Sequence, residues 1–181
     1  MERCVAAARE LANETSSASF TVAQVAARAE VSLKSFYRCF PGKDELLLAL
    51  LEDESNTGAR VLAERVGTRD NAVAALHACV TELFALVSVP GALGYAGVLV
   101  REHRRLSEHY PLELSVALAP LVELVSVHIA AATPTTDARR NAETMFRILL
   151  QGIDDVIVGR AGDAAELAEY LWNFCWKGLE G

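Results

Sequence analysis

Residues 20–51 constrain the fold more than any other part of the chain, because they encode two short helices joined by a tight turn. Thr21 is placed to cap a first helix over about residues 22–29, and Gln24 completes a capping box. This helix carries valine and alanine at helical spacing, and its small side chains allow a neighbouring helix to pack closely. The segment therefore predicts a compact pair of helices.

A second short helix follows the interruption at Glu30-Val31-Ser32, with Ser32 as its cap. On this helix Leu33, Phe36 and Phe40 fall on one stripe and are expected to pack inward, Lys34, Ser35 and Arg38 are expected to point outward, and Tyr37 borders both faces. Pro41-Gly42 ends the helix, because the proline ring and its missing N–H disfavour continuation. The outward polar face fits a DNA groove.

Lys43 is expected at the start of the next helix. The unpaired N–H groups and the positive dipole end of a helix start attract anions. Together with the Lys43 ammonium they predict a seat for a phosphate. The candidate DNA-binding residues are Thr21, Ser32, Lys34, Ser35, Tyr37, Arg38 and Lys43.

The charge of the whole chain disfavours non-specific binding to nucleic acid, since the net charge is −7 and the pI is near 5.1. Between positions 28 and 43, however, the basic residues Arg28, Lys34, Arg38 and Lys43 oppose only Glu30. The predicted footprint on DNA is therefore narrow. It consists of a few phosphate contacts, whose affinity falls steeply as salt rises.

This arrangement closely resembles the DNA-binding domain of the TetR family of transcriptional regulators over roughly residues 5–51. The resemblance rests on Thr21-Val22, Val31-Ser32, Tyr37-Arg38, Phe40-Pro41 and Lys43. It implies a repressor that binds a near-palindromic double-stranded DNA operator as a homodimer and responds to a small-molecule effector. A dimer sets two reading helices about one DNA turn apart, on the order of 34 Å.

Two residues depart from the usual pattern of this family. Glu30 stands where the family usually places glycine, and because the turn needs a left-handed residue, we expect strain there. Lys34 stands where the recognition helix commonly holds glycine, so it strengthens the helix and adds a possible base or phosphate contact. The second departure indicates a difference in DNA specificity.

The chain is predicted to be all-α, because alanine and leucine dominate and β-branched runs are short. We expect a three-helix DNA-binding domain at residues 1–51 and a helical effector-binding and dimerisation domain at residues 52–181. The hydrophobic content of 52% supplies more apolar surface than one protomer buries, which indicates self-association.

Turn and capping residues divide the rest of the chain into further helices. They are expected at about residues 46–66, 72–87, 93–107, 112–132, 137–159 and 163–178, with loops at 67–71, Pro90-Gly91 and 133–136. Residues 110–132 are nearly long enough to span a bilayer, but Glu113, Pro120 and Glu123 interrupt them. We therefore predict a buried central helix kinked near Pro120, and no membrane partner.

The cysteines Cys4, Cys39, Cys79 and Cys175 lack metal-ligand spacing and lie among apolar neighbours, which predicts buried, reduced thiols. The first residues lack the features of a secretion signal, so we expect a cytoplasmic protein. Neither a metal nor a cofactor is expected.

The last two predicted helices carry apolar seams that predict helix packing. One shows Phe146, Leu149, Ile153 and Val156 at helix-packing spacing, with Gly152 allowing a close crossing, and the other is apolar on two sides. The last helix is either buried on both sides within one protomer or part of a four-helix dimer interface, which the resemblance implies. The predicted interface residues are Phe146, Leu149, Gly152, Ile153, Val156, Leu171, Trp172 and Trp176.

The middle of the chain contains the candidates for the effector pocket that the resemblance implies: His77, Phe84, Tyr95, Arg101, His128 and Gln151. These residues place aromatic and polar groups among aliphatic ones, as ligand pockets do. Each also has a purely structural interpretation, such as a hydrogen-bonded histidine or a solvated helix end. By hypothesis, the effector tilts the helix at residues 46–66 and changes the separation of the two reading helices.

Two other classes of protein were weighed. A metal-dependent enzyme using Glu102, His103 and His109 is disfavoured, because that spacing matches no HExxH motif and the two histidines do not share a helix face well. The sequence also lacks a nucleophile elbow and a glycine-rich phosphate loop, so no enzyme is predicted. A helical interaction module without DNA binding is the remaining alternative, which a gel shift against genomic fragments distinguishes from a regulator.

Overall fold

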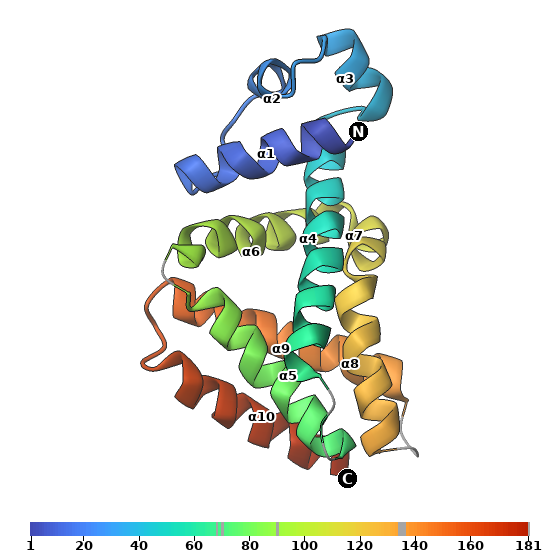
Figure 1. The fold of residues 1–181 in the computed structure, drawn as a ribbon, viewed down its shortest axis with the longest axis vertical. Coiled ribbons are helices and arrows are strands. Elements are labelled where there is room, and N and C mark those ends of the chain that lie inside the picture. Colours follow the sequence, from blue (N-terminus) through green and yellow to red (C-terminus); the bar gives the residue numbers. More distant parts are fainter. Residues whose placement is uncertain (68, 70, 90, 134–136, 181) are drawn as a thin grey trace. The chain divides into compact units, whose positions relative to one another are not determined.

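The structure is a computed structural model that describes residues 1–67, 69, 71–89, 91–133 and 137–180. All regular structure in these residues is helical, which confirms the predicted fold class. In chain order the helices are α1 (Glu2–Thr15), α2 (Val22–Arg28), α3 (Leu33–Cys39), α4 (Lys43–Val66), α5 (Ala72–Val87), α6 (Ala92–His109), α7 (Pro111–Ala117), α8 (Ala119–Ala132), α9 (Ala138–Ile157) and α10 (Ala164–Glu180) (Figure 1).

The chain packs as two compact units. The first consists of Met1–Ser55 and Gly94–Leu118, and the second of Asn56–Leu93 and Ala119–Gly181. Most of α6 and all of α7 therefore pack with the N-terminal helices, although the sequence places them beyond the expected boundary at residue 51. The expected boundary at residue 51 separates the residues that bind DNA from the rest of the chain, and this functional division remains a proposal. The helix α4 continues from the first unit into the second after Ser55, and the first two residues of α6 belong to the second unit.

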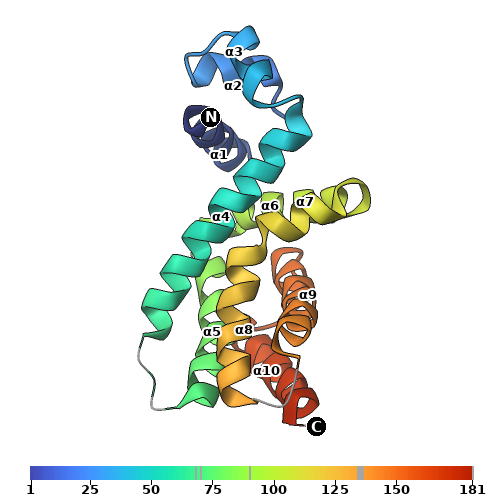
Figure 2. The ribbon, with the colours of Figure 1, turned by 90° about the vertical axis from the view of Figure 1, so that its right-hand side faces the viewer.

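The core of the first unit forms where the short helices meet the start of α4. Phe36 of α3 and Leu46 of α4 are completely buried, together with Ala8 and Ala12 of α1. In Figure 2, α1, α2 and α3 gather around the first turns of α4. The alanines allow close packing, as predicted for this part of the chain. Val98 and Leu106 of α6 join the same core.

The second unit is a bundle in which α5, α8, α9 and α10 pack on one another. Gly152 of α9 sits at a close approach, because an added Cβ would lie 2.5 Å from Leu171 Cδ1 and 3.0 Å from Phe84 Cζ. The close crossing at Gly152 joins α9 to α5 and α10 within one protomer, whereas the sequence predicted it for a dimer interface.

The predicted single central helix at residues 112–132 is wrong, since the chain forms two helices, α7 and α8. The helix α7 is closed by Leu118, whose backbone N–H donates to carbonyl oxygens of α7, and α8 starts at the next residue, Ala119. Pro120 then occupies the first turn of α8, where its missing N–H leaves no helical hydrogen bond unmade. The proline thus marks the start of a new helix.

The other expected helix boundaries agree with the structure within a few residues. Asn71 and Asp137 accept hydrogen bonds from the backbone three residues later and cap α5 and α9. Gly67 adopts a positive φ of 55° directly after α4. Of the expected loops, residues 68, 70, 90 and 134–136 lie outside the described residues.

The structure corrects the prediction that every cysteine is buried. Cys39, the last residue of α3, is exposed, whereas Cys4, Cys79 and Cys175 are buried, and all four are free thiols. Within the described residues no single helix is both long and apolar enough to cross a membrane, and two bent pairs of consecutive helices meet the criterion by length and composition only.

Candidate nucleic-acid interface

The helix α2 starts with the predicted capping box. The Thr21 Oγ1 accepts a hydrogen bond from the Gln24 backbone N–H at 3.2 Å, and the Gln24 side chain accepts one from the Thr21 N–H at 2.7 Å. These two bonds satisfy N–H groups that a helix start otherwise leaves unpaired. They fix the direction in which α2 leaves the preceding loop, and Thr21 stays exposed at the surface.

The turn between α2 and α3 contains the predicted strained residue. Glu30 has a φ of 53°, the left-handed conformation in which glycine is usual. Its neighbour Val31 donates a backbone hydrogen bond to Ala26 O at 2.9 Å, which closes the turn. The Glu30 carboxylate pairs with Arg3 at 3.0 Å, so that its charge is offset by a cation from α1.

The helix α3 is fixed by its cap and by one aromatic cluster. Ser32 Oγ accepts a hydrogen bond from Ser35 N at 3.1 Å. Phe36 is completely buried, with its ring centroid 5.5 Å from those of both Phe40 and Tyr37. Because Phe36 and Phe40 hold the helix to the core, its opposite face is presented to solvent.

The exposed face of α3 carries Lys34 and Arg38, as predicted, together with Tyr37, which was expected to border both faces, whereas Ser35 is half-buried. For neither Lys34 nor Arg38 does the described part of the chain supply a hydrogen bond or an ion pair, so both cations are available for an anionic partner. Leu33 was expected to pack inward and this expectation is wrong, because its side chain is 48% exposed. Phe36 and Phe40 already fill the core beneath α3, which leaves no apolar space for Leu33.

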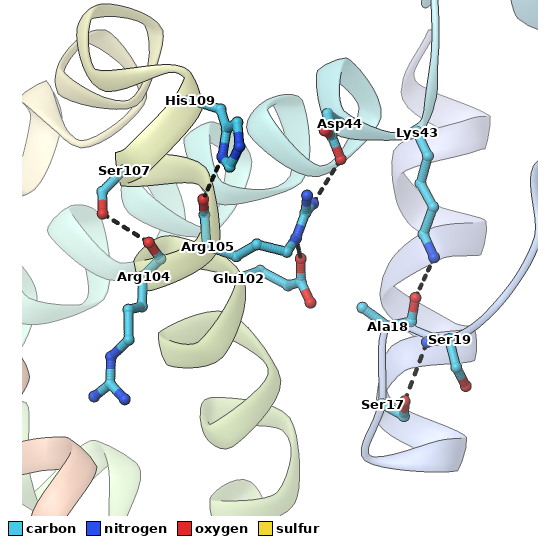
Figure 3. Close-up of polar contacts among 10 residues, drawn as sticks. All are labelled: Ser17, Ala18, Ser19, Lys43, Asp44, Glu102, Arg104, Arg105, Ser107 and His109. Carbon is cyan, nitrogen blue, oxygen red and sulfur yellow. Dashed lines mark hydrogen bonds and ion pairs between the residues drawn. The ribbon is translucent and has the colours of Figure 1, made fainter.

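Lys43 is less accessible than its predicted role as a phosphate seat requires. Its ammonium donates a hydrogen bond to the Ala18 carbonyl oxygen (Figure 3). It also lies 4.7 Å from the centre of the Phe20 ring. Burial lowers the pKa of Lys43 from its ordinary value. The side chain therefore secures the loop between α1 and α2. An ammonium has three N–H donors, so the others remain for a phosphate.

Arg28 does not add to the positive surface in the way the sequence suggested. Its guanidinium contacts Glu14 at 2.8 and 3.0 Å and Glu10 at 3.2 Å, both on α1. The bidentate pair locks α2 against α1 and cancels the charge. The local positive charge is thus concentrated on α3.

The helix α6 is tied to the N-terminal part of the first unit by polar contacts that the sequence does not predict. Arg105 bridges Asp44, at the start of α4, and Glu102 at 2.5 and 2.8 Å (Figure 3). This guanidinium lowers the pKa of Asp44 through its hydrogen bond. Arg101 donates to the Ser16 carbonyl oxygen at 2.9 Å. Pairs so far apart in sequence leave no local pattern to detect.

The same helix contributes one further contact to this unit. The Tyr95 hydroxyl donates to the Glu54 carboxylate at 2.7 Å, and Arg9 of α1 binds the same carboxylate at 2.5 Å and also contacts Asp53. Burial, with the charge of Glu54, raises the pKa of Tyr95, so the phenol stays protonated and acts as a donor. The carboxylate thus links α1, α4 and α6.

The residues predicted to line an effector pocket do not converge. Tyr95 and Arg101 belong to the first unit and make the contacts just described. In the second unit, His77 bonds the Glu169 carboxylate at 2.9 Å, and Gln151 is exposed and donates to Asp155 at 3.3 Å. Phe84 is buried, and His128 is half-buried with its pKa lowered by that burial.

The second unit contains a small apolar cavity that none of these candidates lines. Its volume is about 10 Å³, which is room for about one water molecule. Its walls are Leu62, Leu76, Cys79, Val80, Leu83, Leu121, Val125, Met145, Phe146 and Leu149. Burial raises the pKa of the Cys79 thiol to about 12, so the lining carries no charge near neutral pH.

The predicted dimer-interface residues lie largely inside the protomer. Phe146, Leu149, Gly152, Ile153, Leu171 and Trp172 are buried, and Val156 and Trp176 are half-buried. The exposed apolar side chains of α10 are instead Tyr170 and Phe174, at 65% and 58% exposure. Phe174 borders a groove of about 480 Å³ between α9 and α10.

Comparison with known protein families finds one match, which covers the N-terminal part of the chain. Residues 5–50 match the family model described as bacterial regulatory proteins, tetR family. No curated protein sequence matches the chain.

Solved structures with the same fold span almost the whole chain. A TetR transcriptional regulator from Rhodococcus sp. RHA1 has a TM-score of 0.78 at 17% identity, covering 96% of this chain and 91% of its own. The transcriptional regulator FadR from Bacillus subtilis, in complex with stearoyl-CoA, has a TM-score of 0.73 at 16% identity, with 96% of both chains covered. RolR in complex with resorcinol has a TM-score of 0.72 at 16% identity, covering 99% of this chain and 90% of its own.

The matched residues include α2, the turn and α3, which Ser32 caps and which is exposed on one face. The N-terminal part of the chain therefore resembles the DNA-binding domain of this family, and the solved structures share the fold of the chain.

Proposed function

We propose that this protein is a repressor that binds a near-palindromic operator as a homodimer and is controlled by a small-molecule effector. The observation that carries the proposal is the exposed face of α3, where Lys34, Tyr37 and Arg38 point into solvent and the two cations lack partners in the described chain. Such a regulator works in the cytoplasm, where bacterial DNA lies.

In the proposed complex α3 enters the major groove, and its side chains make different kinds of contact with the DNA. Lys34 lies near the start of the helix, where base edges are reached, and its ammonium suits guanine O6 and N7. Tyr37 and Arg38 lie further along the exposed face and suit phosphates or bases. Thr21, Ser32, Ser35 and Lys43 border this helix and position the backbone of the DNA.

We place the dimer interface on the exposed side of α9 and α10. Tyr170 and Phe174 are large apolar side chains that the protomer leaves in solvent, beside the groove that includes Ile148 and Gly178. A second copy of the same two helices supplies a matching apolar ridge, as a two-fold interface requires. The buried residues that the sequence predicted for the interface then pack beneath this surface.

We propose an effector with an apolar part that binds among the apolar side chains of the second unit and widens the small cavity there. The cavity walls carry aliphatic and aromatic side chains and a neutral thiol. The crystallised relatives FadR and RolR hold stearoyl-CoA and resorcinol, and both ligands contain substantial apolar parts.

The helix α4 is the proposed route from effector to DNA. It supplies Leu62 to the cavity wall and Leu46, Leu47 and Leu50 to the core of the DNA-reading unit. An effector that binds one position of α4 more tightly than the other shifts the DNA-binding equilibrium by that difference in affinity.

The reading surface is tested by selecting bound sequences from random double-stranded DNA and measuring the affinity of variants for the selected site. Lys34→Ala, Tyr37→Ala and Arg38→Ala are each expected to weaken binding roughly tenfold. The matched control is Arg60→Ala, which removes an exposed cation from α4 in the second unit. Unchanged affinity in all three variants overturns the assignment of α3 as the reading helix.

The effector site is tested by a thermal-shift screen of small aromatic and aliphatic compounds, followed by operator binding with each hit. Binding to the folded state raises the unfolding temperature. The proposal expects a stabilising compound to change operator affinity. A compound that binds this unit tightly and leaves operator affinity unchanged contradicts the coupling.

A further inference from the structure

Leu33 is the first residue of α3, and nearly half of its side chain faces solvent, with an exposure of 48%. The core beneath this helix is closed by Phe36 and Phe40, which are 0% and 3% exposed. Leu33 is therefore not needed to fill the interior. A large apolar side chain is instead presented at the start of the helix that reads DNA.

The neighbours of Leu33 show which partner fits this surface. Lys34 follows it directly, and Tyr37, which is 54% exposed, lies one helical turn further along the same side. An apolar side chain flanked by an exposed cation and a phenol suits a partner that combines negative charge with small apolar groups. The major groove of DNA has this chemistry, with phosphates along its edges and thymine methyl groups on its floor.

We propose that Leu33 reads the C5-methyl group of one thymine in each half of the operator. The inference rests on the proposed function and adds a residue that sets specificity. The N-terminal residues of a recognition helix reach the base edges. Leucine has neither a donor nor an acceptor, so the thymine methyl is the one feature of the major-groove edge that it distinguishes by contact.

The size of the effect follows from the burial of a single methyl group. Burying one such group is worth about 0.8 kcal/mol, which corresponds to roughly a fourfold change in the dissociation constant. Two symmetric half-sites give a combined change of roughly fifteenfold. This difference is measurable, and it is smaller than the loss expected from removing a charged base contact.

The experiment uses the whole protein and an operator selected from random double-stranded DNA. Each thymine in the selected site is replaced in turn by deoxyuridine, which removes only the C5-methyl group. Wild-type protein is expected to lose affinity roughly fourfold at one thymine per half-site. In Leu33→Ala this sensitivity should disappear, because the side chain that meets the methyl is gone, whereas Lys34→Ala should keep it.

Three results overturn the inference. The first is that replacing any thymine by deoxyuridine leaves the affinity unchanged. The second is that the loss of affinity persists in Leu33→Ala. The third is that Lys34→Ala also abolishes this loss. Each of these leaves DNA binding itself intact, so the proposed function survives them. Failure to select any DNA removes both proposals. Circular dichroism of Leu33→Ala checks that the exposed substitution leaves the helical fold unchanged.

Discussion

The conformation of one residue, Glu30, shows how far the helix-turn-helix tolerates a departure from its usual sequence. Its left-handed φ of 53° places a residue with a Cβ where glycine is usual. A left-handed conformation costs roughly 1–2 kcal/mol per residue with a side chain. The ion pair with Arg3 recovers little of this, because both side chains are mostly exposed.

Glu30→Gly is therefore expected to stabilise the protein. Removing the left-handed strain outweighs the entropy that glycine loses on folding, roughly 0.5–1 kcal/mol, and the loss of an exposed ion pair. We expect a gain of about 0.5–1 kcal/mol in the free energy of unfolding, measured by denaturant titration. Glu30→Ala is the control, since it loses the same ion pair and keeps the strain. Equal stability of the Gly and Ala variants would argue against strain at this turn.

Ion pairs between side chains of different helices hold those helices together. The Arg105 bridge to Asp44 joins α6 to the first turn of α4, at the start of the helix that follows the reading helix. Because Asp44 has a lower pKa in the folded state than its ordinary value, the native protein binds fewer protons at this carboxyl than the unfolded chain. The bridge thus stabilises the fold above the unfolded pKa, about 3.9.

This linkage predicts how the stability of Arg105→Gln depends on pH. The variant is expected to be less stable than wild type at pH 7. The difference should shrink as the pH falls below about 4 and through the folded pKa of Asp44, because protonation then removes the contact in wild type as well. Denaturant unfolding across that range measures it. Arg147→Gln, at an exposed position of α9, removes the same charge, and a difference that shrinks equally there would contradict the assignment.

Close packing between elements depends on Gly152. Gly152→Ala gains up to about 1 kcal/mol of helix propensity, but its Cβ meets Leu171 at 2.5 Å and Phe84 at 3.0 Å. Overpacking of this kind costs roughly 1–3 kcal/mol, so we expect a net loss of about 1 kcal/mol in unfolding free energy. Gly58→Ala in α4 is the control, since its Cβ meets only Leu121 at an ordinary 3.7 Å. A Gly152→Ala protein more stable than wild type would show that the crossing has room to adjust.

At the scale of the whole molecule, the proposed function requires two copies, and the exposed ridge on α10 is the proposed contact between them. Phe174→Glu places a charge at the centre of this contact and is expected to yield monomers and weaker operator binding. Sedimentation at micromolar protein concentration measures the change. Val127→Glu is the matched control, because Val127 is similarly exposed, at 57%, on α8. A Phe174→Glu protein that remains dimeric would place the interface elsewhere.

The sequence by itself determined the local features of this protein. The capping box at Thr21, the Ser32 cap, the left-handed turn at Glu30 and the helical fold class depend on residues a few positions apart. Hydrogen bonds and backbone preferences at that range are set by the residues themselves. The family resemblance over the N-terminal residues follows from the same short-range pattern.

Only the tertiary structure decided which faces of the helices are covered. Leu33 faces solvent because Phe36 and Phe40 fill the core beneath it. The apolar seam of α9 packs against α5, α8 and α10 of the same protomer. Likewise, α6 joins the DNA-reading unit through partners such as Asp44 and Ser16, far away in the sequence. Helical periodicity shows that a face is apolar, but burial depends on the volume left by every other element, which no single segment encodes.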